Sequence, residues 1–334
     1  MEAVQIGTSG IVASRIALGT WAIGGWMWGG NSDADESIGT IRTAVARGIT
    51  LIDTAPVYGF GRSEEIVGAA LANGLRSRAI IATKAGLELQ GGKVRRNSSP
   101  ARIREEVEAS LRRLRTDYID LYQVHWPDPL VPIHETAGEL RRLMVEGKIR
   151  AIGVSNYSPA QMAEFLEVAP IHSVRPPYNL FERDAEQAVL PYAARQYITV
   201  LCYGALCRGL LTGAITRTTK FKGDDLRRND PKFQEPRFSQ YLNAVASLEH
   251  FARDRYAKPV AALAVRWILD RGDTIALCGA RRAGQLDAVE GAIGWKLDDE
   301  AKLRIEAILA ARIEDPAGPE FMAPPTRDTT ALAA

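Results

Sequence analysis

Short apolar runs alternate with amphipathic stretches along most of the chain. From residue 16 onward, each run of β-branched and apolar residues is followed by a segment whose apolar positions recur at helical spacing. This alternation is typical of βα units around a parallel sheet. It predicts eight strands, at residues 16–18, 51–53, 79–83, 119–125, 149–155, 173–175, 199–203 and 274–278. Helices are predicted at residues 36–47, 100–114, 133–146, 159–168, 186–195, 260–269 and 284–293.

The number of these units and the chain length bear on the fold class. Eight strand signals with their helices in 334 residues favour an α/β fold of the (β/α)8 TIM-barrel type, although the pattern alone leaves an open doubly wound sheet possible. No boundary divides the sequence, so we expect one domain over residues 1–334. An N-terminal β-hairpin is predicted from residues 4–6 and 11–12, and a terminal helix from residues 300–312.

One connection between predicted elements is unusually long. Residues 204–237 exceed the length of an ordinary βα loop, and loops of this size in compact domains are usually functional lids or disordered. We interpret the segment as a lid at the face of the barrel formed by the carboxyl ends of its strands. It would be one of several long βα loops on that face.

Composition and charge narrow the class of protein. With 46% hydrophobic and 25% charged residues, the chain is typical of soluble globular proteins. The formal net charge of +2 gives no support for nucleic-acid binding. The first ten residues do not resemble a signal peptide, and no apolar stretch is long enough to cross a membrane. The three cysteines, without a paired motif, predict neither a disulfide framework nor a metal site, so we expect a cytoplasmic protein.

Four chemically active residues lie at or just after predicted strand ends. Asp53 ends the second strand, Tyr58 follows it, Lys84 comes after the third strand, and His125 ends the fourth. Each has an ordinary structural explanation by itself: a capping carboxylate, a core tyrosine, a rim cation or a buried histidine. In a barrel, however, all four would meet at one end, and that combination indicates acid–base chemistry.

These residue types suit the reduction of a carbonyl group. The reaction needs a hydride at carbon and a proton at oxygen, and Tyr58 is the predicted proton donor. Lys84 would stabilise the tyrosinate and Asp53 would hold Lys84 charged. A ring nitrogen of His125 would orient the carbonyl oxygen. Because no side chain supplies hydride, a redox cofactor is required.

Four sequence stretches resemble the aldo-keto reductase superfamily. They are LIDTAPVYG at residues 51–59, IATK at 81–84, DLYQVHWP at 120–127 and GVSNY at 153–157, and the similarity extends from about residue 8 to residue 285. Within this superfamily the chain resembles the bacterial stress-type reductases in particular. The resemblance implies a (β/α)8 barrel with Asp53, Tyr58, Lys84 and His125 as a catalytic tetrad. It also implies an NADP(H) cofactor, no metal, and a small carbonyl or alcohol substrate.

The same resemblance assigns contacts with cofactor and substrate. It places Ser155 and Asn156 at the nicotinamide carboxamide, Tyr203 beneath the ring, residues 209–213 over the pyrophosphate, and the arginines at 281 and 282 at the adenosine end, which favours NADPH. The full expected cofactor set is Thr20, Trp21, Asp53, Ser155, Asn156, Arg175, Tyr203, Gly204, Leu206, Arg208, Gly209, Leu211, Gly279, Ala280, Arg281 and Gln285. The expected substrate pocket consists of Trp21, Trp28, Tyr58 and Trp126.

The chain departs from the pattern of the superfamily at three places: at position 175, at residues 203–206, which replace the usual Ser-Pro pair, and at Ala214, where a lysine often stands. Arg175 stands where the superfamily usually has glutamine. Glutamine both donates and accepts hydrogen bonds whereas arginine only donates, so the carboxamide would lose an acceptor and nicotinamide affinity would change.

Two other functions remain possible from the sequence. A lysine at a barrel strand end can form a Schiff base, as in an aldolase. Some barrels of the superfamily instead act as nucleotide-binding redox sensors or channel auxiliary subunits with slow turnover. The first alternative leaves the paired arginines at 281 and 282 unexplained. For the second we would expect a long N-terminal extension or a charged docking segment before the barrel, and the sequence shows neither, which favours the enzyme.

Overall fold

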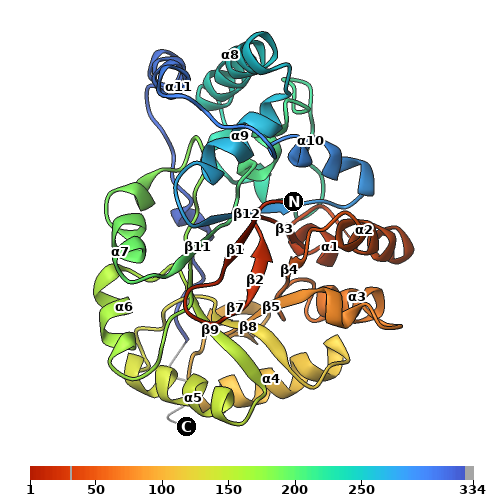
Figure 1. Cartoon of the computed structure of the whole chain (residues 1–334), viewed down its shortest axis with the longest axis vertical. Coiled ribbons are helices and arrows are strands. Elements are labelled where there is room, and N and C mark those ends of the chain that lie inside the picture. Colours follow the sequence, from red (N-terminus) through yellow and green to blue (C-terminus); the bar gives the residue numbers. More distant parts are fainter. Residues whose placement is uncertain (31, 328–334) are drawn as a thin grey trace.

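Eight parallel strands close into a barrel in the computed structural model, which describes residues 1–30 and 32–327 (Figure 1). Each predicted strand overlaps one barrel strand, so the TIM-barrel prediction is confirmed and the open sheet is excluded. The strands, in their order around the barrel, are β3 (Ile16–Gly19), β4 (Leu51–Asp53), β5 (Ile80–Ala85), β8 (Ile119–Val124), β9 (Ile149–Ser155), β10 (Ser173–Arg175), β11 (Thr199–Cys202) and β12 (Thr274–Gly279).

Helices cover the outside of the barrel (Figure 1). Local signals set several of their limits: α4 begins at Pro100, and the hydroxyl of its N-cap Ser99 accepts a hydrogen bond from the backbone of Arg102. The helices are α1 (Trp21–Gly24), α2 (Ala34–Ala46), α3 (Arg62–Ala70), α4 (Pro100–Leu114), α5 (Ile133–Val145), α6 (Pro159–Leu166), α7 (Val189–Arg195), α8 (Arg237–Tyr256), α9 (Val260–Leu269), α10 (Leu286–Glu290) and α11 (Asp299–Arg312).

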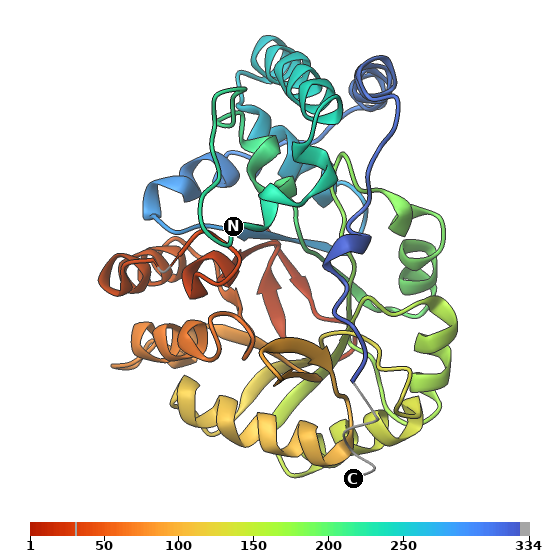
Figure 2. The ribbon, with the colours of Figure 1, turned by 180° about the vertical axis from the view of Figure 1, so that it is seen from behind.

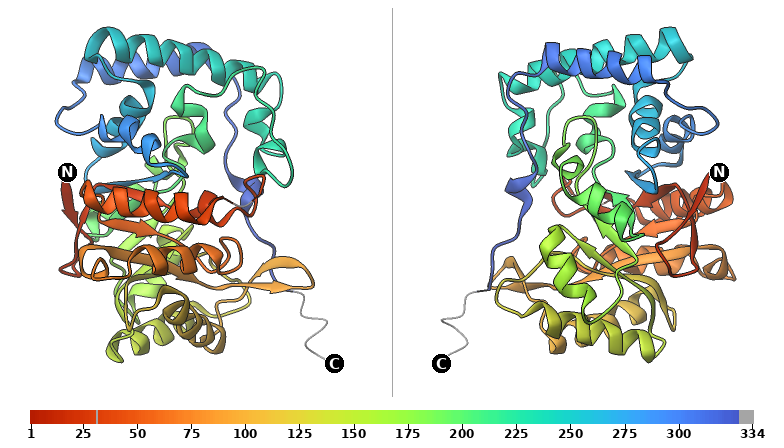
Figure 3. Two further views of the ribbon diagram at one scale, coloured as in Figure 1. Left: turned by 90° about the vertical axis from the view of Figure 1, so that its right-hand side faces the viewer. Right: turned by 60° about the vertical axis from the view of Figure 1, so that its left-hand side comes forward.

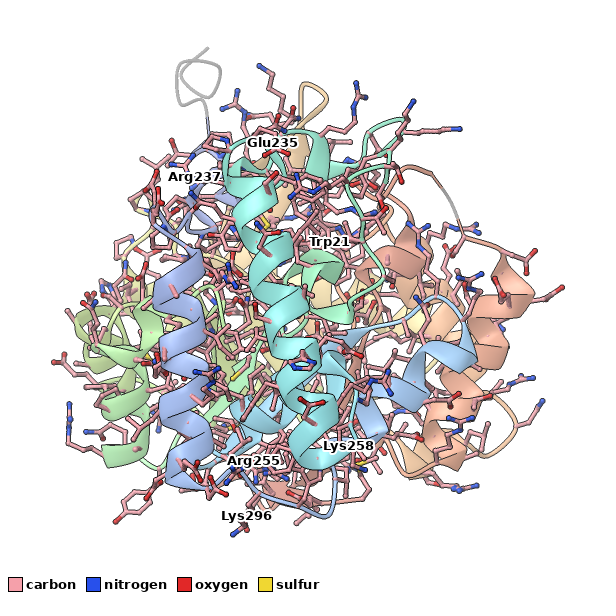
Figure 4. The ribbon with its side chains drawn as sticks, turned by 90° about the horizontal axis from the view of Figure 1, so that it is seen from above. Trp21, Glu235, Arg237, Arg255, Lys258 and Lys296 are labelled. Atoms are coloured by element: carbon pink, nitrogen blue, oxygen red, sulfur yellow. The ribbon has the colours of Figure 1, made fainter. Side chains whose placement is uncertain are left out.

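Three helices, α1, α3 and α8, were not predicted. In α3 the carboxylate of Glu64 is buried, where it accepts hydrogen bonds from Arg113 and Thr83 at 2.6 Å each. This long-range pairing makes a polar sequence suitable for burial, and local periodicity does not reveal it. The 20-residue α8 mixes charged and apolar residues and packs beside α11 (Figure 4). The predicted helix at 284–293 is shorter than expected, because α10 ends at Glu290.

The predicted N-terminal hairpin closes one end of the barrel. It consists of β1 (Ala3–Gln5) and β2 (Val12–Ser14), which pair antiparallel. Ile6 packs in the interior of the barrel against apolar side chains of the strands. Together they form a cluster that is separate from the larger core between the barrel and the helices. The interior cluster comprises Ile6, Ala13, Ala17, Leu51, Ala82, Leu121, Ala151, Leu201, Ile275 and Leu277. Access to the interior is therefore confined to the opposite end.

The segment after α11 runs past that opposite end (Figure 2). It meets a second hairpin, formed by β6 (Leu87–Gln90) and β7 (Lys93–Arg96), which the sequence analysis did not predict (Figure 3). The backbone N–H of Arg96 donates to the carbonyl of Pro325 at 3.0 Å, and its guanidinium donates to the carbonyl of Pro324. The C-terminal segment is thus fastened at the rim of the open end.

Three sequence expectations concern features outside the barrel architecture. Cys202, Cys207 and Cys278 are free and buried. Within residues 1–30 and 32–327, no group of three or more histidine, cysteine, aspartate or glutamate side chains is arranged to hold a metal ion. Over the same residues, no helix has the length and apolar character needed to span a bilayer.

Candidate active site

A cavity of about 650 Å³ opens at the carboxyl ends of the barrel strands. Asp53 and Tyr58 belong to its lining, as do residues 279–282, at and directly after the end of β12. The lining includes five arginines, at positions 175, 208, 227, 281 and 282, against two carboxylates, at positions 36 and 53. The lining therefore carries more positive than negative side chains, which suits an extended anionic ligand, and three of the arginines also pair with carboxylates, at positions 53, 182 and 225.

Asp53 and Lys84 form a buried ion pair at this end of the barrel. They come from the neighbouring parallel strands β4 and β5. The Lys84 Nζ lies 2.9 Å and 3.0 Å from the two carboxylate oxygens of Asp53, and it also donates to the carbonyl of Thr54 at 2.6 Å. Burial lowers the pKa of Lys84 to about 7; the Asp53 carboxylate opposes this shift, and Arg175 adds to it.

Tyr58 lies directly above this pair, in the loop between β4 and α3. The Lys84 Nζ is 4.8 Å from the centroid of the phenol ring. The indole of Trp21 stacks on the ring at 5.8 Å, and the imidazole of His125 meets it edge-on at 5.9 Å. The four side chains expected to form a tetrad are thus gathered in one buried cluster.

A close backbone approach fixes the position of the Tyr58 loop. A Cβ atom at Gly24 would lie 2.5 Å from the carbonyl carbon and oxygen of Tyr58, and one at Gly59 would lie 2.2 Å from the carbonyl oxygen of Gly24. Gly59 also has φ of +68°, a left-handed conformation that favours glycine. These two glycines let α1 support the Tyr58 backbone directly.

We expect Gly24→Ala to displace Tyr58 and lower kcat by roughly 10- to 100-fold, because misplacement by about 1 Å has effects of this size. Steady-state kinetics would measure the change. Gly39→Ala is the matched control, since no atom lies within 4 Å of a Cβ at this exposed position in α2. Equal kcat values in the two variants would show that the glycine contact does not position Tyr58.

The hydroxyl of Tyr58 has a partner that the sequence analysis did not predict. Arg175, at the end of β10, donates from Nη2 to the Tyr58 oxygen at 3.4 Å and to Asp53 Oδ2 at 3.4 Å. Its guanidinium also lies 4.5 Å from the centroid of the Tyr203 ring. The departure at position 175 from the glutamine of the superfamily was the one signal for this role in the sequence.

Burial and charge set the protonation of the remaining groups. Burial raises the pKa of Tyr58 above its ordinary value, while the charge of Arg175 and its hydrogen bond act in the opposite direction. For His125, burial and the charges of Lys84 and Arg175 hold the pKa well below its ordinary value. The imidazole is therefore neutral near pH 7 and has one N–H to donate.

The residues expected to contact a cofactor fall into two groups. Most line the cavity: Trp21, Asp53, Arg175, Tyr203, Gly204, Leu206, Arg208, Gly209, Gly279, Ala280, Arg281 and Gln285. Thr20, Ser155, Asn156 and Leu211 lie outside this lining. Ser155 and Asn156 make a network below it, in which Asn156 donates to the carbonyl of His125 and accepts from the Tyr203 hydroxyl at 3.0 Å.

Arg281 and Gln285 already have partners within the protein. Arg281 donates to the carbonyls of Ala22 and Trp28 at 3.1 Å and 2.6 Å. The side-chain oxygen of Gln285 accepts from the backbone N–H groups of Arg281 and Arg282. Arg282 lines the cavity and is exposed, and no described carboxylate forms an ion pair with it. Arg282 is therefore the better candidate of the two arginines for an added phosphate.

Residues 204–237, interpreted as a lid, form three short 3-10 helices: Cys207–Thr212, Leu226–Arg228 and Pro231–Phe233. The carboxylate of Asp224 accepts from the backbone N–H groups of Met27 and Gly29 at 2.8 Å and 3.0 Å. Arg208, also in this segment, forms a buried ion pair with Glu182 at 2.9 Å. The segment thus contacts the loop after β3 and covers one side of the cavity.

The expected substrate pocket is only partly assembled around this cavity. Trp21, Trp28 and Tyr58 contribute to its wall, and Trp21 meets Trp28 edge-on at 5.7 Å. Trp126 is absent from the lining, and its ring lies 5.3 Å from the guanidinium of Arg96. Met322, from the C-terminal segment, also lines the cavity and was not in the expected set.

Comparison with known proteins identifies a family model, related sequences and a solved structure that are similar to this chain. A model of the Aldo/keto reductase family matches residues 15–310. Aldo-keto reductase YhdN of Bacillus subtilis is 60% identical over 98% of this chain and 99% of its own length. The NADH-specific methylglyoxal reductase of Escherichia coli is 38% identical over 90% of this chain and 95% of its own. The structure of glycerol dehydrogenase AKR11B4 from Gluconobacter oxydans has a TM-score of 0.85 and 56% identity, covering 94% of this chain and 96% of that one.

Proposed function

The chain belongs to the aldo/keto reductase family of oxidoreductases, and we propose that it reversibly reduces small aldehydes and ketones to alcohols with NADPH. The observation that carries this proposal is the buried cluster of Tyr58, Lys84 and Asp53 at a cavity whose lining carries more positive than negative side chains. A cation beside a phenol stabilises the phenolate and so favours donation of the phenol proton to a carbonyl oxygen.

Each side chain in the cluster has a distinct proposed role. Tyr58 holds the proton that passes to the substrate oxygen. Lys84, held by Asp53, favours the tyrosinate that remains by placing positive charge beside the ring. His125 is neutral, so its N–H can orient the carbonyl oxygen without competing as an acid. Bound NADPH would supply the hydride.

The shape and charge of the cavity fit a dinucleotide phosphate. Its wall includes Tyr58, Tyr203, Arg281 and Arg282. Tyr203 would contact the nicotinamide, and the lid residues Arg208 and Gly209 would lie along the pyrophosphate. The rings of Trp21 and Trp28 contribute to the same wall, and their indole nitrogens are buried without a hydrogen-bond partner among the described residues.

We expect Arg282→Ala to raise the KM for NADPH by roughly 10- to 100-fold and to leave the KM for NADH nearly unchanged. A charge-assisted hydrogen bond of about 1.5–3 kcal/mol to the 2′-phosphate accounts for this range. Titration with each cofactor would measure it, with Arg312→Ala on the exposed face of α11 as the control. Parallel changes for both cofactors would remove Arg282 from phosphate recognition. Because the Escherichia coli relative is named as NADH-specific, the proposed preference of this chain for NADPH over NADH requires its own test.

The names of the relatives suggest a substrate range for direct testing. One is named for methylglyoxal and another for glycerol, both small oxygenated molecules. Purified protein would be assayed at the NADPH absorbance band with a panel of aldehydes, methylglyoxal and sugars, and in reverse with glycerol and NADP. We expect saturable turnover with at least one carbonyl compound. Turnover indistinguishable from that of the Tyr58→Phe variant across the panel would contradict the proposal and favour a nucleotide-binding sensor.

A further inference from the structure

The hydrogen-bonding capacity of Lys84 is already used within the barrel. An ammonium group has three N–H donors, and three acceptors surround it: Asp53 Oδ1 at 2.9 Å, Asp53 Oδ2 at 3.0 Å and the carbonyl of Thr54 at 2.6 Å. The cation that donates to the Tyr58 oxygen is instead Arg175. Two cations therefore act on Tyr58, one beside the ring and one at the hydroxyl.

We propose that Arg175 is a positioning residue that holds the Tyr58 oxygen and favours its ionised form, so that this enzyme oxidises alcohols at lower pH than it would with glutamine at this position. The inference rests on the proposed function, since it assigns the acid–base behaviour of the same site. It differs from the carboxamide contact that the sequence suggested for Arg175.

The topology explains how Arg175 reaches this oxygen. β10 is four strands from β4 in either direction around the barrel, so Arg175 approaches Asp53 and the Tyr58 loop from the opposite wall. The long side chain crosses the interior while remaining buried, at 7% exposure. Its Nε has no hydrogen-bond partner among the described residues, so the hydrogen bonds in the cluster come from the end of the guanidinium.

The charge balance of the cluster favours an anion at Tyr58. The groups that face its ring or hydroxyl are Asp53 from β4, Lys84 from β5, His125 after β8, Arg175 from β10 and Tyr203 after β11. With His125 neutral, they comprise two cations and one carboxylate when Lys84 is protonated. A tyrosinate would balance the excess positive charge.

Arg175 and Lys84 differ in the pH at which they lose their positive charge. Burial lowers the pKa of Lys84 to about 7, whereas the pKa of Arg175 is raised by Asp53 and Tyr58 despite its burial. Arg175 therefore keeps its positive charge to a higher pH than Lys84 does.

The chemical consequence concerns alcohol oxidation most directly. In that direction the tyrosinate accepts the hydroxyl proton of the alcohol, and the carbon that bears this hydroxyl transfers a hydride to NADP. One O–H bond and one C–H bond break as the carbonyl forms, Tyr58 becomes protonated, and NADP is reduced. A lower pKa of Tyr58 therefore extends oxidation to lower pH.

Two variants test this role through the pH profile. We expect Arg175→Gln to move the midpoint of the kcat/KM profile for alcohol oxidation upward by about 1–2 pH units, because a hydrogen bond to a charged group is worth about 1.5–3 kcal/mol and each unit corresponds to 1.36 kcal/mol. Arg175→Lys, which keeps a cation, should restore part of this shift. A loss of packing alone would lower activity without moving the midpoint. Identical midpoints in wild type and Arg175→Gln would overturn the proposal.

A readout independent of turnover separates this inference from the proposed function. The ring carbon that bears the hydroxyl of Tyr58 can be observed by NMR in tyrosine-labelled protein and assigned by its loss in Tyr58→Phe. We expect its chemical shift to differ between wild type and Arg175→Gln at the same pH. Identical shifts at every pH would contradict the Arg175 contact. Absence of turnover with a clear difference in shift would instead reject the reductase function and retain the contact.

Discussion

Replacement of Tyr58 by phenylalanine is expected to lower kcat for aldehyde reduction by about 10²- to 10⁴-fold, the usual contribution of a positioned general acid. The variant removes only the hydroxyl, while the ring keeps its stacking contact with Trp21 and its edge contact with His125. NADPH binding should therefore change little. Single-turnover kinetics and cofactor titration by fluorescence would measure the two effects separately.

Tyr197→Phe provides the matched control for this substitution. Tyr197 is 79% exposed and follows α7, away from the residues that line the cavity. Loss of its hydroxyl should leave both kcat and NADPH affinity unchanged. A Tyr58→Phe enzyme with kcat near that of the control would remove Tyr58 as the proton donor and with it the proposed mechanism.

Asp53→Asn is expected to have the largest effect on stability. The carboxylate lies between the buried cations of Lys84 and Arg175, at 2.9 Å and 3.4 Å. Its removal leaves both charges uncompensated, and breaking a buried pair in this way typically costs about 3–5 kcal/mol of unfolding free energy. Urea denaturation at fixed pH would measure the loss.

The stability loss should also depend on pH. The pKa of Lys84 is already lowered in the folded chain, and without Asp53 it would fall further, whereas in the unfolded chain it is about 10.4. At a pH between the pKa of Lys84 in the folded variant and its pKa in the unfolded chain, the unfolded chain binds more protons than the folded one. The free energy of unfolding of the variant therefore rises with pH across this window. The deficit relative to wild type should therefore be larger at pH 6 than at pH 9.

Asp254→Asn is the control for charge removal at the surface. Asp254 is exposed and pairs with the exposed His250, so its replacement should change the unfolding free energy by less than about 1 kcal/mol. A loss of similar size in both variants, or a deficit for Asp53→Asn that does not vary between pH 6 and pH 9, would show that Lys84 does not depend on Asp53 for its charge balance.

The sequence was sufficient to predict the barrel and to bring Asp53, Tyr58 and Lys84 to one end of it. Parallel strands end at a common face, so residues at successive strand ends converge whatever the detailed packing. Local apolar patterning was enough to locate each strand of the barrel. The length of the connection at residues 204–237 predicted a lid, and Arg208 and Arg227 from this segment line the cavity.

Contacts that cross the barrel could not be predicted in this way. The position of the Arg175 guanidinium depends on the closure of the barrel, which sets β10 opposite β4, and on the length of one side chain. Burial of Glu64 in α3 likewise depends on Arg113, which is distant in the sequence. In both cases local patterning carries no information about the partner.

Transfer of deuterium from NADPH labelled at the nicotinamide C4 position would test most directly whether this cavity supports hydride transfer to a carbonyl. With an aldehyde that the enzyme accepts, the account predicts an alcohol that carries deuterium on its former carbonyl carbon. The hydroxyl proton, supplied through Tyr58, would come from solvent. Alcohol formed without deuterium at carbon, or deuterium in the product of the Tyr58→Phe enzyme at the wild-type rate, would contradict the account.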